Sequence, residues 1–216
     1  MRAARYLLAE HSRSRSFVAP LLLLGGGVVV LYAQPPNPVL STAGTVAAFL
    51  FPAQCWLALA FLDSQSAPDR HILAATVGGW RFACSRLLAL AVLAGASSLF
   101  ALLVPLLGGL FKRTPHDNEV ALILAANLIA TIAASALAIP FSAPIVKGRA
   151  LAVLALTTVI VLSIPLRLPP MIPTARALNT THASRVPGRI ATDFLIVLAF
   201  TLVSATIGAW QWRRRE

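Results

Sequence analysis

Charged residues are missing from the interior of six long apolar stretches in this chain. The stretches cover residues 17–33, 45–62, 87–110, 120–139, 151–166 and 193–210. Proteins that move ions with a proton or sodium gradient usually keep carboxylates, lysines or histidines at membrane depth. All four histidines of this chain instead fall outside the stretches. The pattern argues against a gradient-driven transporter, and it predicts that any work the chain does is driven from outside the membrane.

Acidic residues are scarce as well. Seven Asp and Glu face eighteen Lys and Arg, which gives a formal net charge of +11. The basic residues sit in separate short loops rather than on one face, so we expect no nucleic-acid partner. Basic loops in a membrane protein set its orientation and touch anionic lipid headgroups. With 58% hydrophobic residues and a mean hydropathy of +0.80, the composition predicts a membrane protein that contacts lipid along most of its length.

Each apolar stretch is predicted to be an α-helix, because backbone groups in lipid must be hydrogen-bonded within their own segment. The fold class is therefore an all-α membrane protein, one transmembrane domain over residues 1–216 with six transmembrane helices. Residues 1–15 place Tyr6, Leu7 and Leu8 among arginines. This pattern predicts an amphipathic helix at the membrane interface, the alternative being a solvated basic tail.

Orientation follows from the positive charges in the loops. With both termini in the cytoplasm, twelve Lys and Arg lie in the inner segments and six in the outer ones. The positive-inside rule therefore predicts a multi-pass protein of the plasma (inner) membrane with both ends cytoplasmic.

Motifs for catalysis or for binding nucleotides and metals are also absent from the sequence. There is no G-x-x-x-x-G-K-[ST] phosphate loop, so any nucleotide must bind to a separate subunit. The run Gly25-Gly26-Gly27 lies inside an apolar stretch and is predicted to serve helix packing or a kink. Cys55 and Cys84 are interpreted as small apolar fillers, and residues 116–119, His-Asp-Asn-Glu, as a solvated turn. We therefore expect no catalytic residue, no resident metal and no cofactor.

The segment between the second and third stretches is the most specific feature. Ser66 or Ala67 before Pro68 suits a helix start, and Gly78-Gly79 suits its end. Four residues fall on one side of this helix at spacings of three and four: Leu73, Thr76, Val77 and Trp80. The pattern predicts a short cytoplasmic helix. It either presents a knob to a cytoplasmic partner or rests on lipid as a plain connector.

The run Ile72-Leu73-Ala74-Ala75-Thr76-Val77-Gly78-Gly79-Trp80-Arg81 resembles the coupling-helix region of six-span ABC exporter permeases, the ABC type-2 class. The whole plan, an interfacial N-terminal helix and six spans, is similar to that family, and residues 166–191 stand where it has a long outer connection. Asp69-Arg70-His71 stands where the family often has Glu-Arg-Gly-Thr. The resemblance implies that an ATPase subunit binds this helix. The implied contact residues are Asp69, Arg70, His71, Leu73, Thr76, Val77, Trp80 and Arg81.

The resemblance also implies the partners. ATP and Mg²⁺ would bind to the cytoplasmic ABC ATPase, and a second copy or a similar permease would complete the pathway. The largely apolar lining of such a pathway would suit a hydrophobic or amphipathic cargo, such as a drug or a lipid. Four polar residues inside the spans either line that pathway or form hydrogen bonds between helices: Gln54, Asn127, Thr131 and Ser135.

Two other functions stay open. An intramembrane lipid-modifying enzyme or hydrolase would need a nucleophile with a base, or carboxylates that hold a metal. A membrane scaffold without transport of its own would need neither. An ATPase subunit that co-purifies would favour the permease, whereas metal-dependent activity of the purified chain alone would favour the enzyme.

Overall fold

All regular structure that the computed structural model describes is helical. The described residues are 2–32, 39–111, 113–142, 146, 148–163, 178 and 186–214. The longer helices are α2 (Val18–Tyr32), α3 (Val39–Leu62), α5 (Gly79–Leu107), α6 (Asp117–Ala138), α7 (Arg149–Ser163) and α9 (Val186–Arg214). The shorter ones are α1 (Arg2–Arg13), η1 (Arg15–Phe17), α4 (Ala67–Val77) and η2 (Ile139–Phe141). Residues 33, 164–166 and most of the predicted outer connection 166–191 lie outside the described residues.

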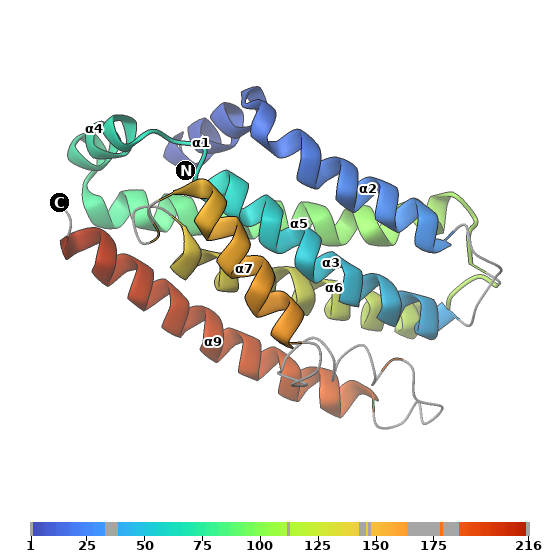
Figure 1. Ribbon diagram of the computed structural model, residues 1–216. Coiled ribbons are helices and arrows are strands. Elements are labelled where there is room, and N and C mark those ends of the chain that lie inside the picture. Colours follow the sequence, from blue (N-terminus) through green and yellow to red (C-terminus); the bar gives the residue numbers. More distant parts are fainter. Residues whose placement is uncertain are drawn as a thin grey trace.

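The longer helices lie side by side and alternate in direction along the chain (Figure 1). Helix α6 is at the centre, where it packs against α3, α5 and α9. Helices α1 and α4 and the C-terminal end of α9 share one end of the bundle. The turn between α5 and α6 is at the opposite end. The alternation is what successive membrane crossings require, and it places the whole 63–78 connection at the end that holds both termini.

Four helices are long and apolar enough to cross a membrane: Val39–Leu62, Gly79–Leu107, Asp117–Phe141 and Ile190–Gly208. A fifth crossing results if α1 and α2, which meet at 82°, are taken as one bent span. Helix α7 has only 15 residues, or about 22 Å at 1.5 Å per residue, against a hydrocarbon core of about 30 Å. The described residues thus fit a multi-pass membrane protein with four or five membrane-length helices, and the six predicted spans are supported in part.

Burial differs sharply between the long helices. In α3, 72% of the most apolar window is buried inside the protein, but in α9 only 22% is. Helix α9 exposes Phe194, Leu195, Leu202 and Val203, a surface too apolar to face water. The outside of the bundle is therefore suited to lipid or to another membrane protein.

Small residues let the inner helices approach closely. On α6 the buried positions include Ala126, Ala130 and Ala134, the side-chain size expected where membrane helices meet. A Cβ added at Gly27 of α2 would lie 2.0 Å from the ring of Phe49 on α3. The predicted packing role of the glycine run is confirmed at this position.

Helix α1 is amphipathic, as predicted, and its apolar side is occupied by protein. Ala4, Leu7 and His11 are buried at successive turns, while Arg5 and Tyr6 are exposed. Helix α1 packs on α5. The basic side of α1 is thus left to face solvent or lipid headgroups at the end that carries α4.

Candidate functional site

Helix α4 begins and ends where the sequence predicts. The Ser66 hydroxyl accepts a hydrogen bond from the Asp69 backbone N–H at 3.3 Å and donates one to the Asp69 carboxylate. Pro68 occupies the first turn, where its missing N–H costs nothing. Gly78 then stops the helix with φ +89°, a conformation that L side chains rarely adopt. A short helix with both ends fixed therefore stands outside the main bundle.

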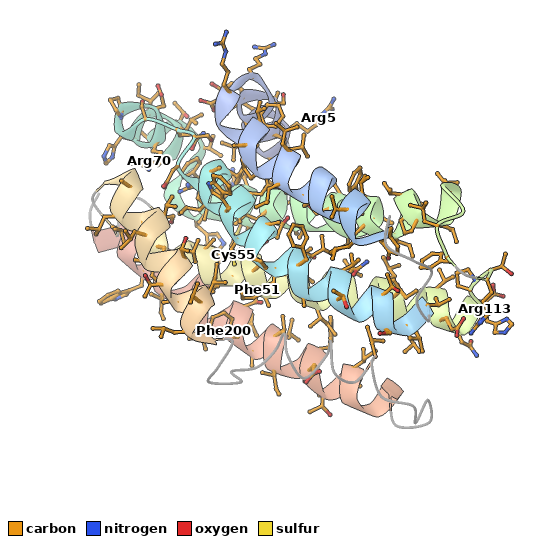
Figure 2. The ribbon with its side chains drawn as sticks, turned by 45° about the vertical axis from the view of Figure 1, so that its right-hand side comes forward. Arg5, Phe51, Cys55, Arg70, Arg113 and Phe200 are labelled. Atoms are coloured by element: carbon orange, nitrogen blue, oxygen red, sulfur yellow. The ribbon has the colours of Figure 1, made fainter. Side chains whose placement is uncertain are left out.

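Basic residues gather at the α4 end of the molecule. Figure 2 shows Arg5 of α1 and Arg70 of α4 at this end and Arg113 at the opposite end. Arg13 at the end of α1 and Arg15 at the start of η1 continue the exposed basic surface. The end that carries α4 therefore fits the cytoplasmic side under the positive-inside rule.

The predicted ATPase contacts divide into two groups. Leu73 packs against the buried apolar cluster of the bundle, to which its neighbour Ala74 belongs, and the predicted contacts Arg70 and Val77 are half-buried. The exposed predicted residues are Asp69, His71, Thr76, Trp80 and Arg81. The side of α4 that is open to a partner is therefore the side away from Leu73 and Val77.

Trp80 does not belong to α4, although the predicted helical spacing placed it there. It lies in the first turn of α5, beyond the break at Gly78, and its side chain is 62% exposed. Ile72 of α4, which was not among the predicted contacts, is exposed to a similar extent, 61%. The sequence feature that could have identified Ile72 as a contact is a large apolar side chain at a helical position that faces outward. Ile72 and Trp80 are thus the large apolar side chains that this surface offers.

Arg86 is a buried cation beside the site. It is only 2% exposed, and its Nη2–H donates to the main-chain carbonyl of Leu62 at the end of α3. The guanidinium carbon lies 5.7 Å from the centre of the Phe82 ring, within reach for a cation–π interaction. Asp63 attracts this charge and Arg70 of α4 repels it. Arg86 therefore connects the two helices between which α4 is inserted.

A second connection joins α1 to the chain just before α4. The buried Gln65 side chain donates from Nε2 to the Glu10 carboxylate at 3.2 Å. One turn after Leu7 on α1, the His11 ring meets the Phe61 ring edge to face, with centroids 5.3 Å apart. Helix α1 is thus held against both the end of α3 and the 63–66 connection.

The predicted intramembrane polar residues meet in the bundle interior. Gln54 of α3 donates from Nε2 to the Ser135 hydroxyl at 3.2 Å. The Thr131 hydroxyl lies 2.8 Å from that of Ser98 on α5, a partner that the sequence did not point to. Asn127 lies one turn before Thr131 and is fully buried. These residues form a polar seam, defined as Gln54, Ser98, Asn127, Thr131 and Ser135.

The polar seam also contains atoms without hydrogen bonds. Among the described residues, neither amide atom of Asn127 has a partner, nor does Oε1 of Gln54. The observed bonds run between helices, which is one of the two roles predicted for these residues. Whether the seam also lines a pathway stays a prediction.

Residues 116–119, His-Asp-Asn-Glu, lie at the end of the bundle opposite α4, where they form the start of α6. The Glu119 carboxylate accepts from the His116 backbone N–H at 3.0 Å, which caps the start of α6. It also pairs with Arg113 at 2.6 Å, and this hydrogen bond raises the pKa of Arg113. The described residues include no group of three or more His, Cys, Asp or Glu side chains that could hold a metal ion.

An open apolar surface depression of about 820 Å³ lies along one face of α7. It is lined by Ala150, Val153, Leu154, Thr157, Thr158, Val161 and Leu162. A depression with so few polar groups suits an apolar molecule, such as a lipid chain, better than a charged one.

Comparison with protein-family models, with curated proteins and with solved structures finds no match for this chain.

Proposed function

We propose that the chain is the permease subunit of an ATP-driven exporter and that α4, with the first turn of α5, docks on a cytoplasmic ABC ATPase. The observation that carries the proposal is the position of α4. It is a capped helix outside the bundle, at the end that holds both termini and the exposed arginines. A plain connector between two spans needs no such helix.

The exposed side of α4 supports docking in a groove of a partner. Ile72 and Trp80 provide exposed apolar anchors. The charged or polar residues Asp69, His71, Thr76 and Arg81 of the same two helices are exposed as well. An apolar centre with a polar rim is the usual layout of a protein interface. Leu73 and Val77 would then transmit force into the bundle rather than touch the ATPase.

The pathway itself would need two such subunits and six crossings from each. The alternating directions of α2, α3, α5, α6, α7 and α9 support six crossings. The exposed apolar surfaces of α5 and α9 would face lipid and the second copy. The expected cargo is hydrophobic or amphipathic, and the open apolar face of α7 is compatible with it; ATP with Mg²⁺ would bind only to the partner.

A charge placed at the centre of the docking surface tests the proposal. In the variant Ile72→Glu, the carboxylate would have to be buried against the ATPase, so we expect the ATPase to be lost from the complex and ATP-driven efflux to stop. The matched control is Tyr6→Glu, an equally exposed position on α1 at the same end. The tagged chain is purified in a mild detergent, and bound proteins are identified by mass spectrometry.

The possible results of this experiment distinguish the proposed permease from its alternatives. An ATPase bound to the wild type and to Tyr6→Glu, and lost from Ile72→Glu, supports the proposal. A wild-type chain that retains no ATPase contradicts it. Equal retention by all three chains places the ATPase contact elsewhere. Metal-dependent lipid hydrolysis by the purified chain alone would replace the proposal with the lipid-modifying enzyme.

A further inference from the structure

We propose that Arg86 and Gln65 are positioning residues for the two connections of α4, so that a movement of α4 becomes a movement of the bundle. Arg86 holds the start of α5 to the end of α3, and Gln65 holds the residues just before α4 to α1. The inference rests on the proposed function for its purpose, but the anchoring itself can be measured without an ATPase. It assigns a role to two buried polar side chains that belong to neither the docking surface nor the polar seam.

Helix α4 has one covalent connection on each side, and a polar contact secures each connection. On the α3 side, Gln65 donates to Glu10 of α1 at 3.2 Å. On the α5 side, Arg86 reaches across to the Leu62 carbonyl, three residues before Gln65. Leu73 and Ala74 already pack α4 on the bundle, and the two polar contacts restrict bending of the residues on either side of it.

The burial of Arg86 indicates that this contact is specific. A guanidinium taken out of water costs several kcal/mol unless it is hydrogen-bonded and paired. The last carbonyls of a helix lack intrahelical partners and carry the negative end of its dipole, so the Leu62 carbonyl is a favourable acceptor. Asp63 adds an attractive carboxylate. A solvated arginine would orient the protein equally well, as Arg81 does from an exposed position five residues earlier.

Arg70 of α4 affects the contact that Arg86 makes with the end of α3. Its guanidinium lies on α4 and repels that of Arg86. Any displacement of α4 by a partner therefore changes the electrostatic balance at the junction of α3 and α5. The Phe82 ring, 5.7 Å from the Arg86 guanidinium, keeps Arg86 in place on its own helix. The charge of Arg70 on α4 thus acts on Arg86 of α5, and Arg86 in turn is hydrogen-bonded to the end of α3.

The experiment measures the position of α4 relative to α1. Spin labels are attached at Ser12→Cys on α1 and Thr76→Cys on α4, both exposed positions, in a chain with Cys55→Ala and Cys84→Ala. The distance distribution is recorded for the labelled parent, for Arg86→Gln and for Gln65→Met. Arg81→Gln is the matched control for the distance distribution alone, since it removes the same charge from an exposed site. In parallel, ATPase retention and ATP-driven efflux are measured in unlabelled variants.

We expect Arg86→Gln and Gln65→Met to broaden the distance distribution and Arg81→Gln to leave it unchanged. ATPase retention should stay at the wild-type level in Arg86→Gln, while efflux falls about tenfold, a typical allosteric coupling. If Arg86→Gln does not fold, Gln65→Met carries the test. Unchanged distributions in the folded variants would overturn the inference, whether or not an ATPase binds. A wild type without an ATPase would contradict only the proposed function.

Discussion

Removing the hydroxyl of Ser135 on α6 should destabilise the protein more than removing the similarly buried hydroxyl of Ser97 on α5. Ser135 accepts the Gln54 amide N–H at 3.2 Å while donating to its own helix at the Thr131 carbonyl. Ser97 of α5 is equally buried but bonds only to the Leu93 carbonyl of its own helix. The two variants Ser135→Ala and Ser97→Ala therefore differ in whether a partner on another helix loses its acceptor.

The magnitude follows from what happens to Gln54. Its side chain is fully buried, and Oε1 already has no hydrogen-bond partner among the described residues, so the amide cannot exchange one partner for another. Polar contacts between membrane helices average about 0.6 kcal/mol and reach about 1.7 kcal/mol. We expect Ser135→Ala to reach the upper value and Ser97→Ala to stay below about 0.5 kcal/mol, since back-bonded serines contribute little to a helix.

A double-mutant cycle isolates this contact. Gln54→Met removes the amide at similar volume, so Ser135→Ala made on that background should cost close to nothing. The free energy of unfolding is measured in mixed micelles with increasing denaturing detergent. The probe is the reactivity of the buried Cys55 thiol, next to Gln54, in a chain with Cys84→Ala.

Equal costs for Ser135→Ala with and without Gln54→Met would refute the reasoning, because the two residues would then be energetically independent. A cost of Ser97→Ala as large as that of Ser135→Ala would refute it too. In that case hydroxyl burial in general, rather than the bond between α3 and α6, would account for the effect.

Three further predictions follow from individual contacts. Gly78→Ala should destabilise the start of α5 and the end of α4 by about 1–3 kcal/mol, because its φ of +89° is strained for any L side chain; unfolding in micelles checks this. Glu119→Ala should cost about 1 kcal/mol by removing the cap on the His116 N–H, whereas Glu119→Gln should keep most of the cap, and thermal unfolding separates the two. A membrane-impermeant maleimide should label Cys84 from the cytoplasm and Thr114→Cys from the opposite side in a chain with Cys84→Ala, and labelling of both from one side would contradict the alternating crossings.

Local features of the fold were predictable from the sequence. The start of α4 at Ser66 and its end at Gly78 depend on capping and glycine conformations that act within a few residues. The amphipathic α1 was visible as arginines alternating with apolar side chains. What the pattern could not show is that the apolar side of α1 is covered by α5 rather than by lipid, since both environments select the same residues.

Contacts between distant segments were not predictable in this way. Gln54 and Ser135 are 81 residues apart, and the sequence identified both as polar residues within spans without pairing them. Arg86 was counted among the inner basic residues, because nothing local indicates that the end of α3 lies beside it. Trp80 was assigned to α4 by helical spacing, which continues across Gly78 although the helix does not.

Site-specific photocrosslinking from Ile72 tests the docking surface most directly. A photoreactive amino acid is placed at Ile72 of α4, and in a second chain at Tyr6 of α1, and cells are irradiated before lysis. We predict that position 72 forms a covalent product with a cytoplasmic nucleotide-binding ATPase and that position 6 does not. A product of position 72 with lipid alone, and with no ATPase, would contradict the account.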